Sequence, residues 1–274
     1  MQDEERLEEL GRKIVRNLYE EGMIRTWYKD RPEGWKLASG LYSPFFISLR
    51  PISSVRSGSI ELYRTAGEAM SIMLKNAGFV ADGKHRIVGI AMAGIALANA
   101  ATLNTGIPSL YTRKLPEEVK TPKDVEEYLS AHGQKALVEG DFNPGDKIAI
   151  IDDLVSTFGS KELAISQIQQ EARRRGINDM ELKDIFVLLD REQGGGERAK
   201  ELGYDLHALV PFASKGIHWL KDVLQPVEYE TIVSYLKNPG DFQSNDAQER
   251  LRAIAANKDD ARPDQKRIKP AKVR

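Results

Sequence analysis

Two adjacent carboxylates at the end of an apolar run are the residues best suited to chemistry in this chain. Asp152 and Asp153 follow residues 148 to 151, and a turn of small and hydroxyl-bearing residues comes after them. The turn consists of Ser156, Thr157, Phe158, Gly159 and Ser160. Such a turn before a helix directs backbone N–H groups and hydroxyls at one point, as phosphate sites do. Because two acids repel a bare anion, they need a polyol or a cation beside the phosphate, and the pattern predicts a sugar phosphate carrying magnesium. A lone Asp would more simply cap the helix.

Cations follow two other apolar segments. Arg113 and Lys114 come after residues 108 to 111, and Arg191 comes after residues 185 to 189. If these segments are strands of one sheet, the cations lie at the same edge as the acids and can bind charged parts of a ligand. For Arg191, a structural ion pair with its neighbour Asp190 remains an equal alternative.

Small and aromatic residues mark two more candidate positions. Ala93 lies in a small-residue turn at residues 89 to 94, which allows either close approach to an anion or tight packing of a strand on a helix. Phe46 belongs to an aromatic segment at residues 39 to 46. That segment alone favours core packing over stacking on a flat ligand.

An alternation of strands and helices is expected to position these residues. The apolar patterns predict strands at residues 86–91, 108–111, 147–151, 185–189 and 206–210, and helices at 3–22, 58–77, 95–103, 162–175, 197–202 and 227–237. This order predicts an α/β fold with a mainly parallel, doubly wound sheet. Ligands of such sheets bind beyond the carboxyl ends of the strands, where the two acids fall.

The expected organisation has three parts. Residues 1 to 54 form an N-terminal helix and a hood, residues 55 to 239 form the core, and residues 240 to 274 form a polar, flexible tail with room for a short helix at 246–256. Within the core, residues 114 to 140 lack core periodicity and are expected to form a mobile lid, with a solvated insertion as the alternative.

Composition excludes several classes of function. The chain has 274 residues, a net charge of −1 and no cysteine, which excludes disulfides, thiolate metal sites and a thiol nucleophile. The balanced charge argues against nucleic-acid binding. No apolar run approaches the length of a membrane span, and the first residues are acidic, so we expect no membrane association and a cytoplasmic location.

Together these segments resemble the type I phosphoribosyltransferases, and more narrowly the orotate phosphoribosyltransferases. IAIIDDLVSTFGS (148–160) resembles the signature of the whole superfamily. LASGLYSPFFISLR (37–50), YTRK (111–114), HG followed by VEG (132–140) and VLLDREQGG (187–195) resemble the orotate branch. The resemblance covers roughly residues 5 to 237 and implies the type I phosphoribosyltransferase fold, a central mainly parallel sheet flanked by helices with a small N-terminal hood.

The resemblance also implies roles for the candidate residues. Asp152 and Asp153 match the pair that holds the ribose hydroxyls of phosphoribosyl pyrophosphate, and the turn after them matches the loop that binds its 5-phosphate. Arg113 and Lys114 match the cations that bind pyrophosphate, and His132 matches the histidine of a mobile loop. Contacts to the pyrimidine ring and its carboxylate are implied for Phe46 and Arg191.

The implied activity is that of a pentosyltransferase, which transfers ribose 5-phosphate from phosphoribosyl pyrophosphate to orotate in pyrimidine biosynthesis. Magnesium is the implied cofactor. The magnesium ion is expected to be bound with phosphoribosyl pyrophosphate, and Asp152 or Asp153 is the candidate protein ligand. Relatives are homodimers in which the loop of one subunit closes over the site of the other.

The chain departs from the family pattern in two places. Alanines stand at positions 38 and 93, where many or some relatives have lysine, and 17 residues separate Lys114 from His132 where relatives have only a few. This insertion contains Lys120 and Lys123, so the position of the loop lysine stays open, with Lys120 as the candidate. Two alternatives also stay open: a phosphoribosyltransferase for another nucleobase, and a non-catalytic regulator that binds phosphoribosyl pyrophosphate or a nucleotide.

Overall fold

A six-stranded sheet forms the centre of the protein. The computed structural model describes residues 2–37, 40–53, 59–131 and 136–257. Within these ranges the strand order of the sheet is β10-β9-β8-β5-β6-β7, and all neighbours are parallel except β7, which pairs antiparallel with β6 at one edge. The strands are β5 His85–Gly89, β6 Ser109–Thr112, β7 Val138–Glu139, β8 Lys147–Val155, β9 Glu181–Asp190 and β10 Asp205–Pro211.

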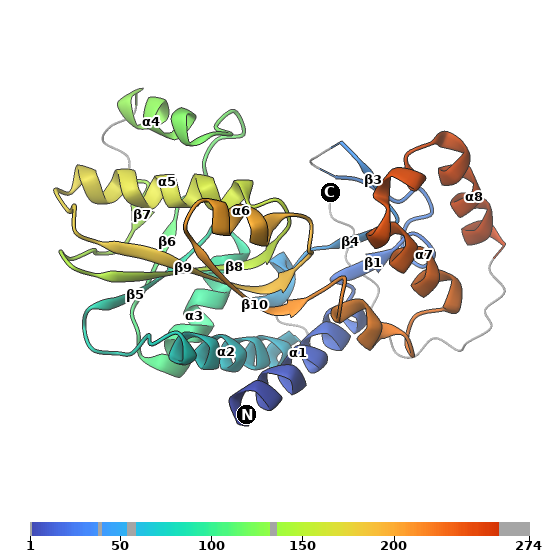
Figure 1. Cartoon of the computed structure of the whole chain (residues 1–274), viewed down its shortest axis with the longest axis horizontal. Helices are drawn as coiled ribbons and strands as arrows, with labels where there is room; N and C mark the ends of the chain where they lie inside the picture. Colours follow the sequence, from blue (N-terminus) through green and yellow to red (C-terminus); the bar gives the residue numbers. More distant parts are fainter. Residues whose placement is uncertain (1, 38–39, 54–58, 132–135, 258–274) are drawn as a thin grey trace.

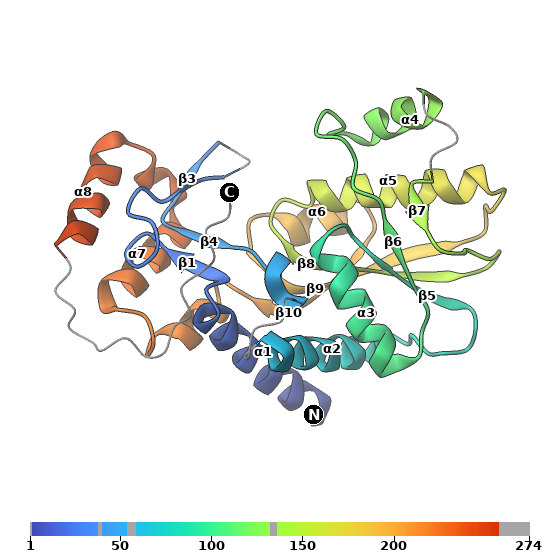
Figure 2. The same cartoon turned by 180° about the vertical axis from the view of Figure 1, so that it is seen from behind.

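Helices cover both faces of this sheet (Figure 1). One face carries α5 (Gly159–Arg174) and α6 (Gly195–Glu201), with α4 (Pro122–Ala131) outside α5. The other face carries α1 (Gln2–Glu20), α2 (Ser59–Asn76) and α3 (Ala93–Thr105). Figure 2 shows from behind that α2 and α3 lie side by side. The expected α/β fold class, with a central, mainly parallel sheet flanked by helices, is confirmed.

The hood lies beside the carboxyl edge of the sheet and combines segments from both ends of the chain (Figure 1). Two small antiparallel sheets, β1 with β4 and β2 with β3, come from the N-terminal third. C-terminal helices complete it. Its elements are β1 Ile24–Thr26, β2 Trp35–Lys36, β3 Tyr42–Ser43, β4 Phe45–Ile47, α7 Pro226–Lys237, η3 Pro239–Phe242 and α8 Asn245–Ala256; the short turns η1 Arg50–Ser53 and η2 Gly216–Leu220 connect it to the core.

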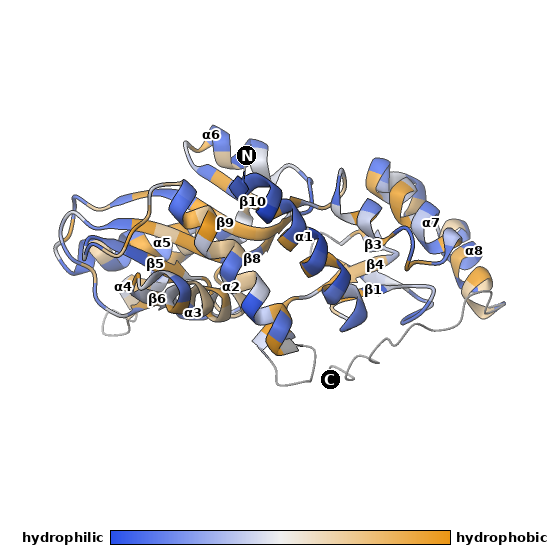
Figure 3. Cartoon of the chain, turned by 90° about the horizontal axis from the view of Figure 1, so that it is seen from below, coloured by the Kyte–Doolittle hydropathy of each residue, from blue (hydrophilic) through white to orange (hydrophobic). Residues whose placement is uncertain are grey.

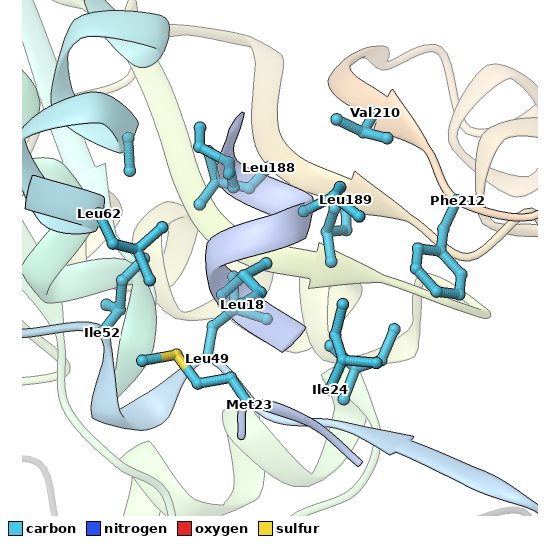
Figure 4. Close-up of a cluster of buried hydrophobic side chains, with 14 of the residues drawn as sticks. Leu18, Met23, Ile24, Leu49, Ile52, Leu62, Leu188, Leu189, Val210 and Phe212 are labelled. Atoms are coloured by element: carbon cyan, nitrogen blue, oxygen red, sulfur yellow. The ribbon is translucent and has the colours of Figure 1, made fainter. Parts of the chain in front are cut away.

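One hydrophobic cluster joins the hood to the sheet. Leu18 of α1, Ile24 of β1, Leu189 of β9 and Phe212 after β10 are buried in it (Figure 4). In Figure 3 the strands of the sheet are mainly hydrophobic, whereas α1 shows a largely hydrophilic surface. This pattern follows from burial, since the strands are covered on both faces and α1 on one. The hood is therefore held firmly against the sheet edge.

Strand β8 differs from the prediction in length. It was expected to end at residue 151, but it continues to Val155 and includes both acids. Its extension pairs with β9, because Asp152 lies opposite Val187 and Leu154 lies opposite Leu189. The acids are thus held by a sheet rather than by a turn.

The insertion is a packed helix. Residues 114 to 131 were expected to be polar and without core periodicity, but Val119 and Val125 are buried, and α4 lies along α5. Gln170 of α5 donates a hydrogen bond to Glu126 (2.7 Å). The missed signal is Thr121-Pro122-Lys123-Asp124, a capping box in which the Thr121 hydroxyl accepts from the backbone N–H of Asp124 (3.2 Å) and the Asp124 carboxylate accepts from the backbone N–H of Thr121 (2.9 Å). Residues 132 to 135 lie outside the described residues.

Residues 240 to 256 were expected to belong to a flexible tail, and this expectation does not hold for them. The possible short helix in this region is α8, whose Leu251 is buried and whose backbone carbonyl accepts a hydrogen bond from Trp27 Nε1 (3.0 Å). Gln243 makes two hydrogen bonds with the backbone of Tyr42 (2.8 and 3.2 Å). Residues 258 to 274 lie outside the described ranges. Among the described helices, none is long and apolar enough to cross a membrane.

Candidate active site

Asp152 is buried and fully hydrogen-bonded. Its Oδ2 accepts from Nζ of Lys161 (2.6 Å), and its Oδ1 accepts from the backbone N–H of Asp153 (2.9 Å). The exposed fraction of Asp152 is 7% and that of Lys161 is 2%. Lys161 was not predicted from the sequence. The available signal was a lysine in the first turn of a helix that starts beside two acids.

Asp153 is the less constrained acid. It is partly buried, and its Oδ1 accepts from the backbone N–H of Leu154 (2.8 Å). Burial in the site, followed by the charge of Asp152, raises the pKa of Asp153 from 3.8 to about 7, while Lys161 acts in the opposite direction. A carboxylate in these surroundings is stabilised by a hydroxyl donor or a cation.

The turn after β8 has a buried anchor and an exposed rim. Phe158 adopts a left-handed backbone conformation (φ 75°), and its side chain is buried against Tyr204. Thr157 and Ser160 are exposed, and a Cβ on Gly159 would meet no atom within 4 Å. Phe158 therefore contributes backbone only, and its side chain holds the loop in place.

The start of α5 is free for an anion. The backbone N–H groups of Gly159 and Ser160 donate to no acceptor in the described part of the chain. Helix N-termini leave such groups unsatisfied, and the helix dipole adds positive potential at this point. With the hydroxyls of Ser156, Thr157 and Ser160 nearby in the chain, the turn has the donors of a phosphate site.

The small-residue turn between β5 and α3 is explained by packing. A Cβ on Gly94 would lie 2.4 Å from the carbonyl oxygen of Ile151, and one on Gly89 would lie 2.6 Å from the carbonyl oxygen of Gly94. Ala93, the first residue of α3, is buried. Of the two interpretations, tight packing accounts for both glycines, because Gly89 lies where β5 meets α3 and Gly94 lies where α3 meets β8. Because Gly94 also lies against Asp152, this packing supports the acid from behind.

The predicted cations lie after β6, two strands away from β8. Arg113 and Lys114 are both exposed, and Arg113 Nε lies 3.3 Å from Glu139 Oε1. The backbone carbonyl of Arg113 accepts from Gln167 of α5 (2.9 Å). Lys120 is exposed near the start of α4, and His132 lies outside the described residues. Both side chains at the end of β6 are thus accessible to a charged ligand.

Arg191 is a buried cation whose guanidinium has no hydrogen-bond partner among the described contacts. Only 7% of it is exposed, and neither Nε nor Nη2 has a hydrogen-bond partner. Burial lowers the pKa of its guanidinium, and the nearby Tyr235 opposes that shift. The guanidinium carbon lies 5.1 Å from the ring centre of Phe45, whereas Phe46 is stacked on Trp35 (5.9 Å).

The ion pair between Arg191 and Asp190 considered above is absent among the described contacts, since Asp190 Oδ1 instead accepts from the backbone N–H of Glu192 (2.8 Å). Phe46, which the resemblance implies as a contact to the pyrimidine ring, is half-buried, and this contact stays a prediction; the ring beside Arg191 is Phe45.

The fold brings the acids, the turn and Arg191 together. Arg191 follows β9, the neighbour of β8, and its backbone N–H donates to the carbonyl oxygen of Val155 just before the turn (2.9 Å). The site therefore combines two acids, a helix N-terminus and an unpaired buried guanidinium at one sheet edge. This set suits a ligand with hydroxyls, a phosphate and a second anionic group.

Comparison with known proteins finds relatives of this chain in sequence and in structure. The chain is 31% identical to the orotate phosphoribosyltransferase of Staphylothermus marinus over 176 residues, 64% of this chain and 72% of the relative. It is 26% identical to the orotate phosphoribosyltransferase of Methanocaldococcus jannaschii over 198 residues, 72% of this chain and 92% of the relative. The orotate phosphoribosyltransferase structure from Aeropyrum pernix has a similar fold, with a TM-score of 0.54 at 20% identity, covering 77% of this chain and 97% of that one. No family model matches the chain.

Proposed function

Because the chain belongs to the orotate phosphoribosyltransferase family, we propose that it transfers ribose 5-phosphate from phosphoribosyl pyrophosphate to orotate. The products are orotidine 5'-phosphate and pyrophosphate, and the reaction belongs to pyrimidine biosynthesis. Within the phosphoribosyltransferases, the residues around the acceptor base must determine which base is used.

The observation that carries the choice of orotate is the unpaired guanidinium of Arg191. A buried cation without a partner is costly, so its presence indicates an anion in the complex. Orotate differs from uracil by a carboxylate, which an arginine can bind through two parallel hydrogen bonds. A neutral base would leave Arg191 unpaired, and a site built to bind a charged group rejects ligands that lack it.

The sugar phosphate is assigned to the acids and the turn. The carboxylate of Asp153 accepts hydrogen bonds from the ribose hydroxyls, while the first N–H groups of α5 bind the 5-phosphate. The unreactive phosphate anchors the substrate at one end, so the reacting carbon is held at a fixed place relative to the base.

Bond breaking develops negative charge on the leaving pyrophosphate and positive charge on the sugar. Arg113 and Lys114 stabilise the leaving group, because they are exposed cations at the same edge of the sheet. Lys120, which is exposed just before α4, and His132 are also proposed to contact the leaving group. Orotate is presented as an anion at its ring nitrogen, so no strong base is required, and exclusion of water prevents hydrolysis of the activated sugar.

Magnesium is proposed as the cofactor, bound with phosphoribosyl pyrophosphate. The donors present fit it, since Asp153 offers a hard carboxylate oxygen and the substrate offers phosphate oxygens. No group of three or more metal-ligating side chains occurs among the described residues. Bound magnesium would neutralise charge on the pyrophosphate.

Two broader expectations also stay proposals. A homodimer is supported by large exposed apolar side chains on adjacent helices, since Leu103 of α3 is 84% exposed and Ile60 of α2 is 47% exposed. Analytical ultracentrifugation of the chain tests it, and Leu103→Asp should weaken the dimer. The cytoplasmic location stays a prediction, to be tested by cell fractionation.

The reaction is tested by pyrophosphate release with magnesium, phosphoribosyl pyrophosphate and one base at a time. We expect release with orotate and at least about a hundredfold less with uracil, adenine or hypoxanthine. Faster release with another base would identify a different phosphoribosyltransferase. Binding of phosphoribosyl pyrophosphate without release with any base would instead indicate a regulator.

A further inference from the structure

Lys161 occupies a position that is unfavourable for a lysine on two counts. It is the third residue of α5, where the helix dipole repels a cation, and only 2% of the residue is exposed. A buried ammonium group also loses its hydration. A lysine at this position therefore requires strong local compensation.

The compensation comes from three acceptors around Nζ. They are Oδ2 of Asp152 (2.6 Å), the backbone carbonyl of Leu154, and Oγ of Ser160 (3.3 Å). An ammonium group has three N–H donors, so all of them are used. Two acceptors belong to β8 and one to the first turn of α5, so Lys161 ties the end of the strand to the start of the helix.

This tie closes the turn that is proposed to bind the 5-phosphate. Asp152 and Lys161 are nine positions apart, and residues 153 to 160 lie between them. Phe158 holds the same turn through its buried ring. The turn therefore has two internal anchors, one polar and one apolar, while its exposed hydroxyls and N–H groups face outward.

Lys161 also changes what Asp152 can do. With Oδ2 on Lys161 and Oδ1 on the backbone N–H of Asp153, both oxygens are engaged within the protein. Gly94 lies against Asp152 from a third element, since a Cβ there would be 3.2 Å from Oδ1. Asp153 has no such bond to a side-chain cation among the described contacts, so the two acids have different surroundings.

We propose that Lys161 is a positioning residue of the ribose phosphate site, which holds Asp152 as an internal anchor and leaves Asp153 as the acid that contacts the sugar. This inference rests on the proposed function and assigns different roles to the two acids. Asp152 acts through Lys161 and the shape of the turn. Substrate binding depends on the ion pair between Asp152 and Lys161, because the turn must keep the first N–H groups of α5 directed at the 5-phosphate.

The test compares Lys161→Met with the wild-type chain by calorimetric titration of ribose 5-phosphate and by steady-state kinetics. We expect about tenfold weaker binding of ribose 5-phosphate and a similar rise in KM for phosphoribosyl pyrophosphate, with a smaller change in kcat. A purely structural role would instead reduce the fraction of folded enzyme, which lowers kcat at constant KM. Wild-type chain that neither binds ribose 5-phosphate nor releases pyrophosphate would count against the proposed function rather than against Lys161.

A matched control is Lys147→Met. Lys147 begins the same strand at its opposite end, and its Nζ lies 3.8 Å from Asp184 Oδ2. It is an ion-paired lysine at the end of β8 opposite to the turn, and its replacement should leave KM and the affinity for ribose 5-phosphate unchanged.

A double variant tests the role of Asp152 and also covers the case in which Lys161→Met folds poorly. Asp152→Asn with Lys161→Met removes both charges, so no unpaired buried carboxylate remains and much of the thermal stability should return. If Asp152 acts through Lys161, the double variant binds ribose 5-phosphate no more weakly than Lys161→Met alone. A further loss of about tenfold in affinity for ribose 5-phosphate would show that Asp152 contacts the sugar itself and would overturn the proposal. Wild-type affinity and wild-type KM in either folded variant would also overturn it.

Discussion

Replacing Asp153 by asparagine should make the apo protein more stable and less active. The raised pKa of Asp153 means that the folded protein disfavours its ionised form, because the carboxyl is buried beside the charge of Asp152. An asparagine side chain has a similar shape and no charge, so it avoids this cost. The same change removes the acid that we propose accepts the ribose hydroxyls, so the two effects have opposite signs.

The pH window follows from the direction of the shift. Between about pH 4 and about pH 7 the folded chain retains a proton that the unfolded chain has released, so the stability of the wild-type protein falls as the pH rises through this range. One pKa unit corresponds to about 1.4 kcal/mol. The rise from 3.8 to about 7 therefore limits the stability that Asp153→Asn can gain, at a pH above this window, to roughly 4 kcal/mol. Because Asp153 is only partly buried and an amide needs partners of its own, we expect a gain of about 1–2 kcal/mol, or roughly 2–8 °C in Tm.

The assay is thermal and urea denaturation of the apo protein at about pH 8 and at about pH 5, with ribose 5-phosphate titration at the higher pH. The gain in stability should be largest at the higher pH and shrink at the lower one. Affinity for ribose 5-phosphate should fall by about ten- to a hundredfold, the usual range for a hydrogen bond to a charged group.

The neighbouring carboxylate supplies a matched control. Asp152→Asn should destabilise the protein by about 3–5 kcal/mol, because it leaves the ammonium of Lys161 buried without its counter-ion. The reasoning fails if Asp153→Asn is less stable than wild type at the higher pH, or if the two replacements change stability in the same direction.

Three further predictions concern other parts of the protein. Arg191→Met should raise KM for orotate about tenfold or more while KM for phosphoribosyl pyrophosphate changes little, and steady-state kinetics showing an unchanged orotate KM would contradict the assigned carboxylate contact. Lys114→Ala should lower kcat on the order of a hundredfold, and unchanged turnover in the pyrophosphate assay would remove Lys114 from the mechanism. Gln243→Ala removes two hydrogen bonds to the backbone of Tyr42 and should lower stability by about 1–2 kcal/mol in urea denaturation, whereas an unchanged midpoint would show that these two hydrogen bonds do not stabilise the C-terminal segment.

Much of the architecture was predictable because the signals were local. The continuous apolar runs predicted the central parallel strands and the intervening helices, and they placed Asp152, Asp153 and the small-residue turn at the carboxyl edge of the sheet. Strands β9 and β6 likewise delivered Arg191 and Arg113 to that edge. These predictions depend only on the alternation of elements and on the fixed direction of parallel strands.

The errors arose where a residue's environment depends on a distant segment. The segment at 114 to 131 looked polar because its few apolar residues, among them Val119 and Val125, are buried by α5 from another part of the chain. The C-terminal segment looked mobile because its anchor is Trp27, more than two hundred residues away in sequence. Neither contact has a periodic signature within its own segment.

Sequence alone established which chemical groups stand at the carboxyl edge: paired acids, the turn proposed to bind phosphate, and cations, on a mainly parallel α/β sheet. Tertiary packing decided how those groups differ from one another. Lys161 forms an ion pair with Asp152 and has none with Asp153 among the described contacts, and Arg191 lies buried over Phe45 with no anion beside it in the described structure. The physical reason is that charge and hydrogen-bonding capacity belong to the residue, whereas desolvation and the choice of partner belong to the three-dimensional surroundings.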